Sequence, residues 1–484
     1  MTILDQLAAS RADRPAALAV NDVSYDDLCV GMLRVAWRLR ELGLGSGDRI
    51  ALYCENRIGF VYAYLAALRL GAIAVPTNVL YRRTDLSHVL DDADAAMMLA
   101  SEQTTPNAQE VDNKRTLVMA EDLEAWAIDP SIAPLDGVPL PDDDAPAIII
   151  YTSGTTGRSK GAVLSHGNLA TIATQVSSAW RWTARDTLAI ALPLFHVHGL
   201  GAGLNGSLAA GGRIIIHERF DATKMLATLR EPDVTMFFGV PTMYVRLLEQ
   251  IGTGDAPTLR LCVSGSAALS PEIHAQFEER FGMTILERYG STEFGFALGN
   301  RYGGPRVGGS VGVPFSGVRV RIDAPDSTGV GEILVSGPNV FIGYWRNSEA
   351  SAAAFVVDAD GTRWFHSGDL GAYDAQAQVY RIVGRIKELI ISGGFNVYPL
   401  EVETEIDRFP SVRASAVVGV PDAARGEIAV AFIEADAAFE VESLLAYLRE
   451  RLASFKLPKR IEVVDALPRN ALGKLEKSKL KARV

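Results

Sequence analysis

The chain has 484 residues, of which 48% are hydrophobic and 22% are charged, and its formal net charge is −11. This length suggests more than one domain, and the composition is that of an ordinary globular protein. The negative charge argues against a general nucleic-acid-binding protein, which would present a basic face. It leaves room for a local basic patch that binds an anionic ligand.

The three cysteines, Cys29, Cys54 and Cys262, stand in apolar stretches without a C-x-x-C pair or a His cluster. We expect buried structural thiols and a reducing compartment. The first twenty residues show no basic region followed by an apolar core, as a secretory signal would. The most apolar segment, residues 60–76, is interrupted by Arg69 and is too short to span a bilayer. We therefore expect a soluble cytoplasmic protein, as a monomer or a homodimer.

Buried strand patterns alternate with a helical pattern at the start of the chain. Strands are expected at 48–56, 71–78, 95–100 and 147–153, and a helix at 58–70. Their short links predict parallel pairing with right-handed crossovers. Residues 101–146 are polar and acidic, so we expect surface structure that runs into a loop.

The rest of the chain divides into three patterns. The first pattern predicts further strands at 186–195, 211–218, 234–241, 259–267 and 284–293. The second predicts shorter strands at 317–323, 331–338 and 377–385. The third is a βαβ-like unit with strands at 412–421, 427–435 and 459–468 and a helix at 441–453. We predict an α/β fold. A large N-terminal domain of parallel and mixed sheets packs with helices and carries a β-rich subdomain, and a small mobile α+β domain follows near Lys387.

The most unusual segment is "YTSGTTGRSKGAVLSH", residues 151–166, which stands between a strand-like and a helix-like run. It is neither a Walker A loop nor a dinucleotide-binding G-x-G-x-x-G. Its glycines let backbone N–H groups turn toward an anion, and its hydroxyl groups and Lys160 add donors and positive charge. These features favour a polyphosphate site. A strand-to-helix turn with capping hydroxyl groups would use the same residue types.

This segment resembles the signature loop of the adenylate-forming superfamily, which includes acyl-CoA synthetases, adenylation domains of peptide synthetases and luciferases. Further motifs follow in the order of that family: "LPLFHVHG" (192–199), "FFGVPTMY" (237–244), "SGSAALS" (264–270), "ERYGSTE" (287–293), "GEILVSGPNVFIGYW" (331–345), "WFHSGDLG" (364–371), "GRIKELIISGGFNVYPLEVE" (384–403) and "LPRNALGKLEK" (467–477). The resemblance covers nearly the whole chain. It implies a domain at 1–386 that binds AMP and the acyl group, and a mobile domain at 387–484 with its hinge at Lys387.

The resemblance implies a ligase that activates a carboxylic acid with ATP and transfers the acyl group to a thiol. It implies that Thr292 and Glu293 lie at the α-phosphate and that Glu293 binds Mg²⁺, since a hard cation prefers carboxylate oxygen. Asp369 would bind both ribose hydroxyl groups, supported by Arg385, and Tyr289 would stack on adenine. The full set expected at the nucleotide is Thr152, Ser153, Gly154, Thr155, Thr156, Gly157, Lys160, Gly265, Ser266, Ala267, Glu287, Arg288, Tyr289, Gly290, Ser291, Asp369 and Arg385.

The C-terminal motifs imply two poses of the small domain. In one pose Lys474 would bridge the attacking carboxylate and the α-phosphate, a contact whose loss typically costs roughly 10²–10³ in rate. In the other pose Gly393 and Gly394 would leave room for a pantetheine arm. Lys456, in "SFKLPKR", would contact the CoA phosphates or stand in a solvated turn. Hinges absorb such motions at few residues.

The sequence determines the identity of the carboxylic acid substrate least. His196 is expected to line or gate the acyl site, and His198 either joins it or packs in the core. At Arg288 and Arg246 the sequence resembles malonyl-CoA synthetases, in which an arginine of the "ERYG" segment pairs with the second carboxylate of the substrate. Phe294 and Phe296 depart from that pattern and would suit a medium-chain, branched or aryl acid. Coenzyme A is the expected thiol, and a separate carrier protein is the alternative.

Overall fold

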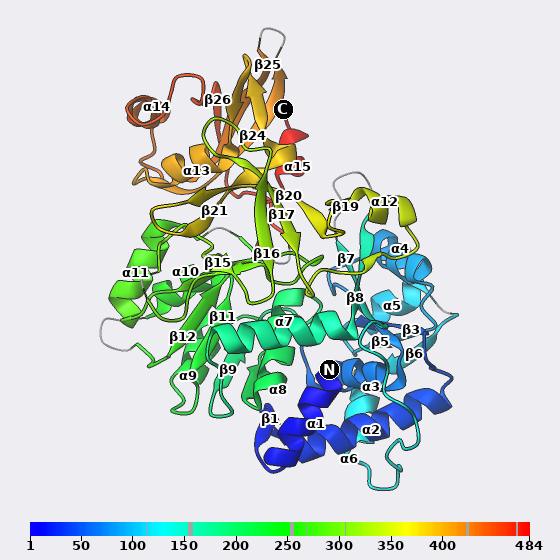
Figure 1. Cartoon of the computed structure of the whole chain (residues 1–484). Coiled ribbons are helices and arrows are strands. Elements are labelled where there is room, and N and C mark those ends of the chain that lie inside the picture. The colour runs from blue at the N-terminus through cyan, green and yellow to red at the C-terminus, as the bar shows by residue number, and fades with distance from the viewer. Residues whose placement is uncertain are drawn as a thin grey trace.

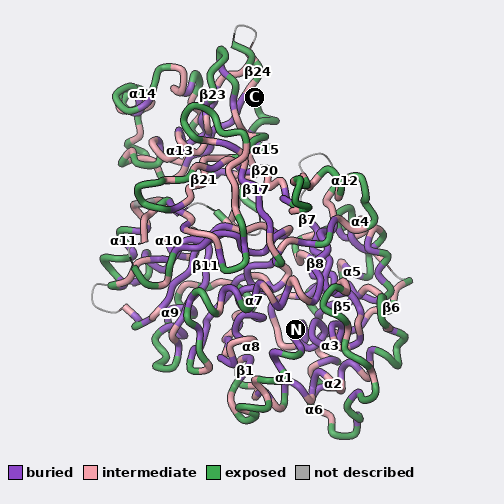
Figure 2. Tube along the Cα trace, viewed as in Figure 1, coloured by how far each residue is buried: buried purple, intermediate pink, exposed green. Residues whose placement is uncertain are grey.

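The structure, a computed structural model, describes residues 1–112, 114–152, 158–251, 256–267, 269–304, 306–422, 425–470 and 473–484. Figure 1 shows a large lower body, built from the N-terminal part of the chain, and a smaller C-terminal unit above it. Buried segments concentrate in the sheets and the helices between them, while exposed segments follow the loops and the outer helices (Figure 2). This arrangement confirms the predicted α/β class.

One sheet of the lower body begins with the predicted alternation. Its order is β18 (Gly343–Tyr344), β8 (Lys160–Ser165), β7 (Pro146–Thr152), β4 (Ile73–Pro76), β3 (Arg49–Tyr53), β5 (Met97–Ala100) and β6 (Thr116–Met119). Strand β3 pairs in parallel with β4 and β5, as predicted. The helix between β3 and β4 is α3 (Ile58–Leu70), which is also as predicted. Such strands are apolar on both faces because helices cover both.

Two expectations in this sheet were wrong. The segment 101–146 was expected to be surface structure running into a loop, but it also forms α5 (Thr105–Val111), β6 and α6 (Ala120–Ile128), and β6 extends the sheet beside β5. Only Val118 of β6 is buried, so its apolar pattern is weak. Secondly, β8 rather than a helix follows the glycine-rich segment, and it pairs antiparallel with β7. The next helix, α7 (His166–Ala179), starts only where Ser165 and Asn168 form a capping box.

A second sheet carries the next group of motifs. Its order is β15 (Val313–Pro314), β14 (Leu298–Gly299), β13 (Leu286–Tyr289), β12 (Leu261–Ser264), β11 (Met236–Gly239), β9 (Thr187–Ile190), β10 (Arg213–Ile216), β1 (Leu18–Val20) and β2 (Val23–Ser24). Strands β9 to β13 pair in parallel. Their carboxyl ends therefore meet at one edge, where ligands bind in open α/β sheets.

Helices surround these two sheets, and α7 crosses the middle of the molecule (Figure 1). The remaining helices of the lower body are α1 (Ile3–Asp13), α2 (Tyr25–Glu41), α4 (Arg83–Ala93), the π-helix η1 (His198–Asn205), α8 (Gly206–Ala210), α9 (Ala222–Leu229), α10 (Pro241–Gln250), α11 (Pro271–Phe281) and α12 (Ser348–Ala353). The three cysteines are free and buried, as predicted. Within the described ranges no helix is both long and apolar enough to cross a bilayer.

The predicted β-rich part is an antiparallel sheet. It is formed by β16 (Arg319–Asp323), β17 (Gly331–Ser336), β20 (Arg363–Asp374), β19 (Phe355–Val357) and, beside β20, β21 (Val379–Arg385). The short 3-10 helix η2 (Ile386–Glu388), which contains Lys387, follows β21 directly. The remaining elements of the chain follow this helix.

The C-terminal unit has a sheet and hydrophobic clusters of its own. Its elements are β22 (Ile390–Ser392), β23 (Phe395–Val397), α13 (Pro399–Asp407), β24 (Val412–Asp422), β25 (Gly426–Ala435), α14 (Val441–Arg449), β26 (Arg460–Val463) and α15 (Lys477–Lys481). The expected βαβ pattern is found in β25, α14 and β26, where the two strands pair in parallel. Strands β24 and β25 instead pair antiparallel, since the link between them is too short for a crossover.

Candidate active site

Three residues expected at the adenosine come together where β13 meets β20: Asp369 and Arg385, predicted at the ribose, and Tyr289, predicted at the adenine. The Tyr289 hydroxyl group donates a 2.7 Å hydrogen bond to Asp369 Oδ2, and Arg385 Nε lies 3.1 Å from Asp369 Oδ1. Burial raises the pKa of the Asp369 carboxyl group, and the charge of Arg385 opposes this rise. The paired carboxylate therefore stands at the edge where ligands are expected.

Glu332 on β17 holds the bend that presents Asp369, and sequence reasoning missed it. Its Oε1 accepts a 2.9 Å hydrogen bond from the Gly368 N–H, and its Oε2 lies 2.9 Å from His366 Nδ1. The available signal was an acidic residue inside the otherwise apolar run of β17, which would have indicated a paired rather than a solvated carboxylate.

A second cluster forms around Glu293. Its Oε2 accepts a 2.8 Å hydrogen bond from the Ser291 hydroxyl group, and its Oε1 a 3.2 Å bond from the Tyr344 hydroxyl group. Lys160 Nζ lies 5.1 Å from the centre of the Tyr344 ring, within the range of a cation–π contact. Thr292 is buried next to Glu293. The cluster thus joins an ammonium group and a carboxylate from two distant motifs.

Tyr344 was not singled out from the sequence, although it belongs to the quoted "FIGYW" run. It enters the site because β18 pairs with β8. Thr152 is the last residue of β7 and pairs with Lys160 on β8. The predicted loop residues Ser153, Gly154, Thr155, Thr156 and Gly157 lie outside the residues that the structure describes.

Arg288 is the most unusual charged residue of the site, because its side chain is only 5% exposed. Its guanidinium Cζ lies 4.5 Å from the centre of the Phe296 ring, and Nη2 donates a 3.4 Å hydrogen bond to Ser266 Oγ. Its Nε has no partner among the described residues, and none of the salt bridges found among them involves Arg288. Burial lowers the pKa of Arg288 to about 9.

The "SGSA" segment shapes the space around Arg288. A Cβ at Gly265 would lie 2.5 Å from Arg288 Cζ, so a larger residue there would displace the guanidinium. Ser266 has φ +72°, a left-handed conformation that is uncommon for serine and that clusters at functional sites. Ala267 is exposed beside it.

Two histidines lie on the same side of the site as Arg288. Burial, followed by the charges of Lys474 and Arg288, lowers the pKa of His196 to about 3. His198 is 1% exposed and packs against Phe238 and Phe296, at ring-centre distances of 6.1 Å each. Its pKa also lies well below the usual value, chiefly because of burial. Both imidazoles are therefore neutral at pH 7.

Lys474 comes from the C-terminal unit into this group. Burial and the charges of Arg385 and Arg288 lower its pKa to about 8, while Asp369 and Glu293 act in the opposite direction. Its backbone N–H donates a 3.1 Å hydrogen bond to Asn470 Oδ1. The neighbouring Gly473 lies against α10, where an added Cβ would be 3.1 Å from Thr242 Oγ1. The predicted adenylation lysine is thus next to the predicted nucleotide residues.

Several expected residues do not join this group. Arg246 is exposed on the outer side of α10, which corrects its expected place in the acyl site, because helical periodicity turns it away from Tyr244 in the core. Glu287 faces the opposite side of the sheet from its neighbour Arg288, accepts a hydrogen bond from Gly309 N–H, and has a pKa raised by burial to about 7. Gly290 lies so close to Gly295 O that a Cβ would clash.

Phe294 and Phe296 are both 0% exposed. Phe294 packs against Tyr289 and Phe365, with ring centres at 5.5 and 5.8 Å. Phe296 supports Arg288 and His198, as described above. The expectation that these rings line an open acyl pocket is corrected in this respect: they pack in the core and present no free surface.

The predicted CoA residues lie together on the C-terminal unit. Gly393 and Gly394 have φ values of +59° and +83° and form the turn between β22 and β23, a conformation that favours glycine. Phe395 stacks on Phe455 at 4.7 Å, which brings the turn near Lys456. Lys456 Nζ forms a 2.5 Å ion pair with Glu401.

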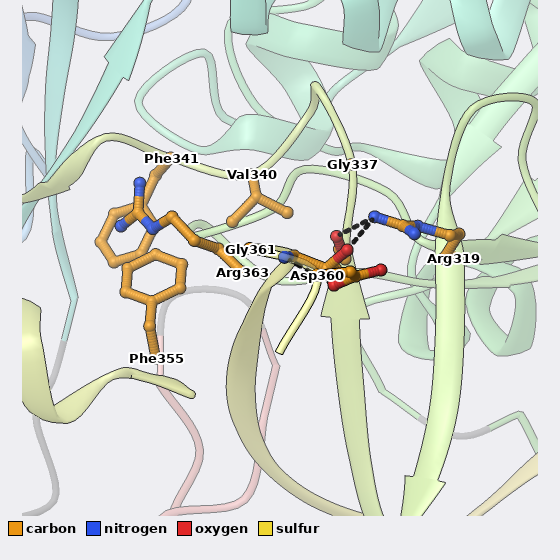
Figure 3. A pocket seen from close by; sticks show the side chains of 10 residues that line it. Arg319, Gly337, Val340, Phe341, Phe355, Asp360, Gly361 and Arg363 are labelled. Carbon is orange, nitrogen blue, oxygen red and sulfur yellow. Dashed lines mark hydrogen bonds between the residues drawn. The ribbon is translucent and has the colours of Figure 1, made fainter. Parts of the chain in front are cut away.

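A hollow of about 480 Å³ lies elsewhere, on the antiparallel sheet (Figure 3). Its lining includes Arg319, Phe355 and Arg363. Arg319 already donates to Ser336 and Thr362, each at 3.3 Å, and Arg363 lies over the Phe355 ring. None of its lining residues belongs to the predicted site.

The fold and this group of residues define a nucleotide-dependent, adenylate-forming enzyme. The family model of the AMP-binding enzyme matches residues 4–345, and that of the AMP-binding enzyme C-terminal domain matches residues 401–474. The chain belongs to the AMP-binding enzyme family, which confirms the resemblance.

Its relatives are CoA ligases. A feruloyl-CoA synthase of Amycolatopsis sp is 35% identical over 473 residues (95% of this chain and 94% of the relative). An oxalate–CoA ligase of Arabidopsis thaliana is 36% identical over 470 residues (92% and 90%), and a malonate–CoA ligase of the same plant is 33% identical over 489 residues (91% and 79%). ATP-bound MatB from Rhodopseudomonas palustris has a TM-score of 0.92 and 36% identity, covering 100% of this chain and 99% of that chain. The chain is accordingly an AMP-forming acid–thiol ligase.

Proposed function

We propose that this ligase activates a short dicarboxylic acid, such as malonate or methylmalonate, and transfers it to coenzyme A. The observation that carries the proposal is the buried guanidinium of Arg288, which has no carboxylate partner among the described residues. A buried charge is costly unless it is paired. A second carboxylate on the acid would supply the missing partner in the bidentate geometry that guanidinium favours.

The surroundings of Arg288 favour a small acid. His196 and His198 are neutral and bring no competing charge. The buried ring of Phe296 packs against the guanidinium. Two of the relatives are named for the diacids oxalate and malonate, which also supports the proposal.

For the first half-reaction we assign each charged group to one part of ATP. Thr152, the glycine-rich segment and Lys160 bind the β- and γ-phosphates, Thr292 lies at the α-phosphate, and Asp369 and Arg385 hold the ribose. The "SGSA" and "ERYGS" segments frame the adenine, with Tyr289 beside it. Lys474 and Arg288 neutralise charge on the acid and the α-phosphate. Fixed cations of this kind lower the barrier where charge develops.

Magnesium is compatible with the residues around Glu293. No group of three or more potential metal ligands occurs among the described residues. Mg²⁺ commonly binds one or two carboxylates together with substrate phosphates, and Glu293 offers a carboxylate oriented by Ser291 and Tyr344. When bound, the ion would neutralise phosphate charge.

For the second half-reaction we propose that residues 387–484 rotate as a unit about Lys387 relative to residues 1–386. The Gly393–Gly394 turn would then face the site and admit the pantetheine arm, and Lys456 would contact a CoA phosphate. The independent hydrophobic clusters of the C-terminal unit support motion as one body.

An aromatic acid is the second candidate. The 35% identity with a feruloyl-CoA synthase over nearly the whole chain favours it. In that case Arg288 would have only a structural role, and a phenyl ring would have to displace Phe296 or neighbouring side chains.

The decisive experiment measures ATP- and CoA-dependent AMP release with malonate, methylmalonate, octanoate, benzoate and ferulate. We expect malonate or methylmalonate to be preferred, and Arg288→Ala to lower kcat/KM for it by roughly 100-fold or more, the loss typical of a broken buried charge pair. The control is Arg246→Ala, which removes an exposed arginine and should leave the rate unchanged. Preference for ferulate, benzoate or octanoate, with no effect of Arg288→Ala, would refute the diacid clamp.

A further inference from the structure

Lys477 is a largely enclosed cation three residues beyond Lys474. It begins α15, and its side chain is 17% exposed. Its Nζ lies 2.9 Å from Glu388 Oε2 and 2.7 Å from Glu403 Oε1. One ammonium group therefore joins three elements: η2, α13 and α15.

One carboxylate of this triad is held by a further contact, and the other acts on the Arg385 guanidinium. Glu403 is buried, and its Oε1 also accepts a 2.6 Å hydrogen bond from the Val417 N–H on β24. Glu388 is one residue beyond Lys387. Its charge, after that of Asp369, raises the pKa of the Arg385 guanidinium, so Glu388 also acts on the pair that is expected to hold the ribose.

The position of Lys474 needs such an anchor. Its ammonium group is held near Arg385 and Arg288, and these like charges, together with burial, disfavour its charged form. Among the described residues, backbone bonds close the segment locally, from Asn470 N–H to Lys474 O at 2.9 Å and from Glu476 N–H to Pro468 O at 2.8 Å. Leu467 and Leu475 fix it to a hydrophobic cluster of the C-terminal unit, and the ion pairs of Lys477 add a link to η2 and α13.

We propose that Lys477 is a positioning residue for the adenylation step. Its ion pairs with Glu388 and Glu403 tie the segment that carries Lys474 to η2, which contains Lys387, and to α13. This inference rests on the proposed function, in which Lys474 acts in the first half-reaction only. A displacement of about 1 Å at a reacting group can cost roughly 10²-fold in rate. Loosening the triad therefore slows adenylation and leaves thioester formation intact.

The test compares the two half-reactions in Lys477→Met, using the acid that the wild-type enzyme prefers. Acid-dependent ATP–pyrophosphate exchange should fall by roughly 10- to 100-fold, while thioester formation from supplied acyl-adenylate and CoA should stay within about twofold of wild type. Lys477→Arg should recover most of the exchange rate, since it restores both ion pairs. Retained thioester formation shows that the variant is folded.

Lys479→Met is the matched control. It lies on the same helix, is 62% exposed, and pairs with Glu476 at 2.5 Å, so neither half-reaction should change. Equal loss of both half-reactions in Lys477→Met, or no loss in either, would overturn the positioning role while leaving the ligase function in place. Wild-type enzyme without exchange activity on any acid of the panel would instead contradict the proposed function, and the inference with it.

Discussion

At the scale of single residues, the site depends on Gly265, a residue without a side chain. Gly265 leaves the space in which the guanidinium of Arg288 lies, and Phe296 supports the other face of that group. The requirement is steric rather than conformational, since the neighbouring Ser266, and not Gly265, adopts the left-handed region. The specificity proposed for Arg288 therefore rests on Gly265 as well.

The substitution Gly265→Ala tests this dependence. Its Cβ would lie 2.5 Å from Arg288 Cζ, so the guanidinium must move. We expect kcat/KM for the preferred diacid to fall roughly 10- to 100-fold, the cost of a misplaced charged hydrogen bond. Gly303→Ala is the control, because its Cβ would meet only Arg181 Nη2 at 4.0 Å. Steady-state kinetics measures kcat/KM of both variants. An unchanged kcat/KM in Gly265→Ala would show that the action of Arg288 does not depend on a glycine at residue 265.

At the scale of elements, a β-hairpin rather than a strand-to-helix turn carries the glycine-rich segment. Strand β8 therefore pairs with β18 along its other edge, which places Tyr344 of β18 beside Glu293, a residue 51 positions away in sequence. A helix at this place would have no such edge. The carboxylate of Glu293 thus owes its orientation to strand pairing.

Tyr344→Phe removes this orienting contact while it keeps the ring over Lys160. A hydrogen bond to a charged group contributes about 1.5–3 kcal/mol, but Ser291 still binds the other oxygen of Glu293. We expect a rate of ATP–pyrophosphate exchange lowered by roughly tenfold and a higher Mg²⁺ concentration at half-maximal rate. Tyr373→Phe, an exposed tyrosine of β20, should behave as wild type. An unchanged Mg²⁺ dependence in Tyr344→Phe would separate this tyrosine from the metal.

At the scale of the whole molecule, the C-terminal unit completes the site by placing Lys474 beside Arg385 and Arg288. Burial, followed by the charges of Arg385 and Arg288, lowers the pKa of Lys474 from 10.5 to about 8. The lysine is charged below that pH and neutral above it. The ammonium group of Lys474 therefore titrates close to physiological pH in this assembled arrangement.

We expect kcat/KM for adenylation to be level below pH 8 and to fall above it, since kcat/KM reports the pKa of the free enzyme. Lys474→Arg should lower the rate but move this fall to higher pH, because the ordinary pKa of arginine lies above that of lysine. Between pH 8 and 10.5 the unfolded chain binds more protons at this lysine than the folded chain, so its titration increases stability as pH rises. A parallel measurement of Tm separates the catalytic loss from unfolding, and a level profile to pH 10 would contradict the role of Lys474.

The sequence was sufficient for the class, for most strands of the two large sheets and for the family, because continuous apolar runs and long motifs are local signals. Helix α3 was predicted at its observed bounds, and Asp369, Arg385 and Tyr289 were predicted as one group and lie within hydrogen-bonding distance. Strand β6 was missed because four residues with one buried side chain carry too weak a pattern.

The contacts made by long-range pairing could not be predicted. Whether an arginine is buried without a carboxylate partner among the described residues, as Arg288 is, or exposed, as Arg246 is, depends on which elements cover it. The same holds for Tyr344 at Glu293, for Glu332 behind Asp369 and for Lys477 between two carboxylates. Residue type and spacing specify which chemistry is available, whereas burial and distance, which set pKa values and the partners of each charge, arise only when the sheets and the C-terminal unit are packed together.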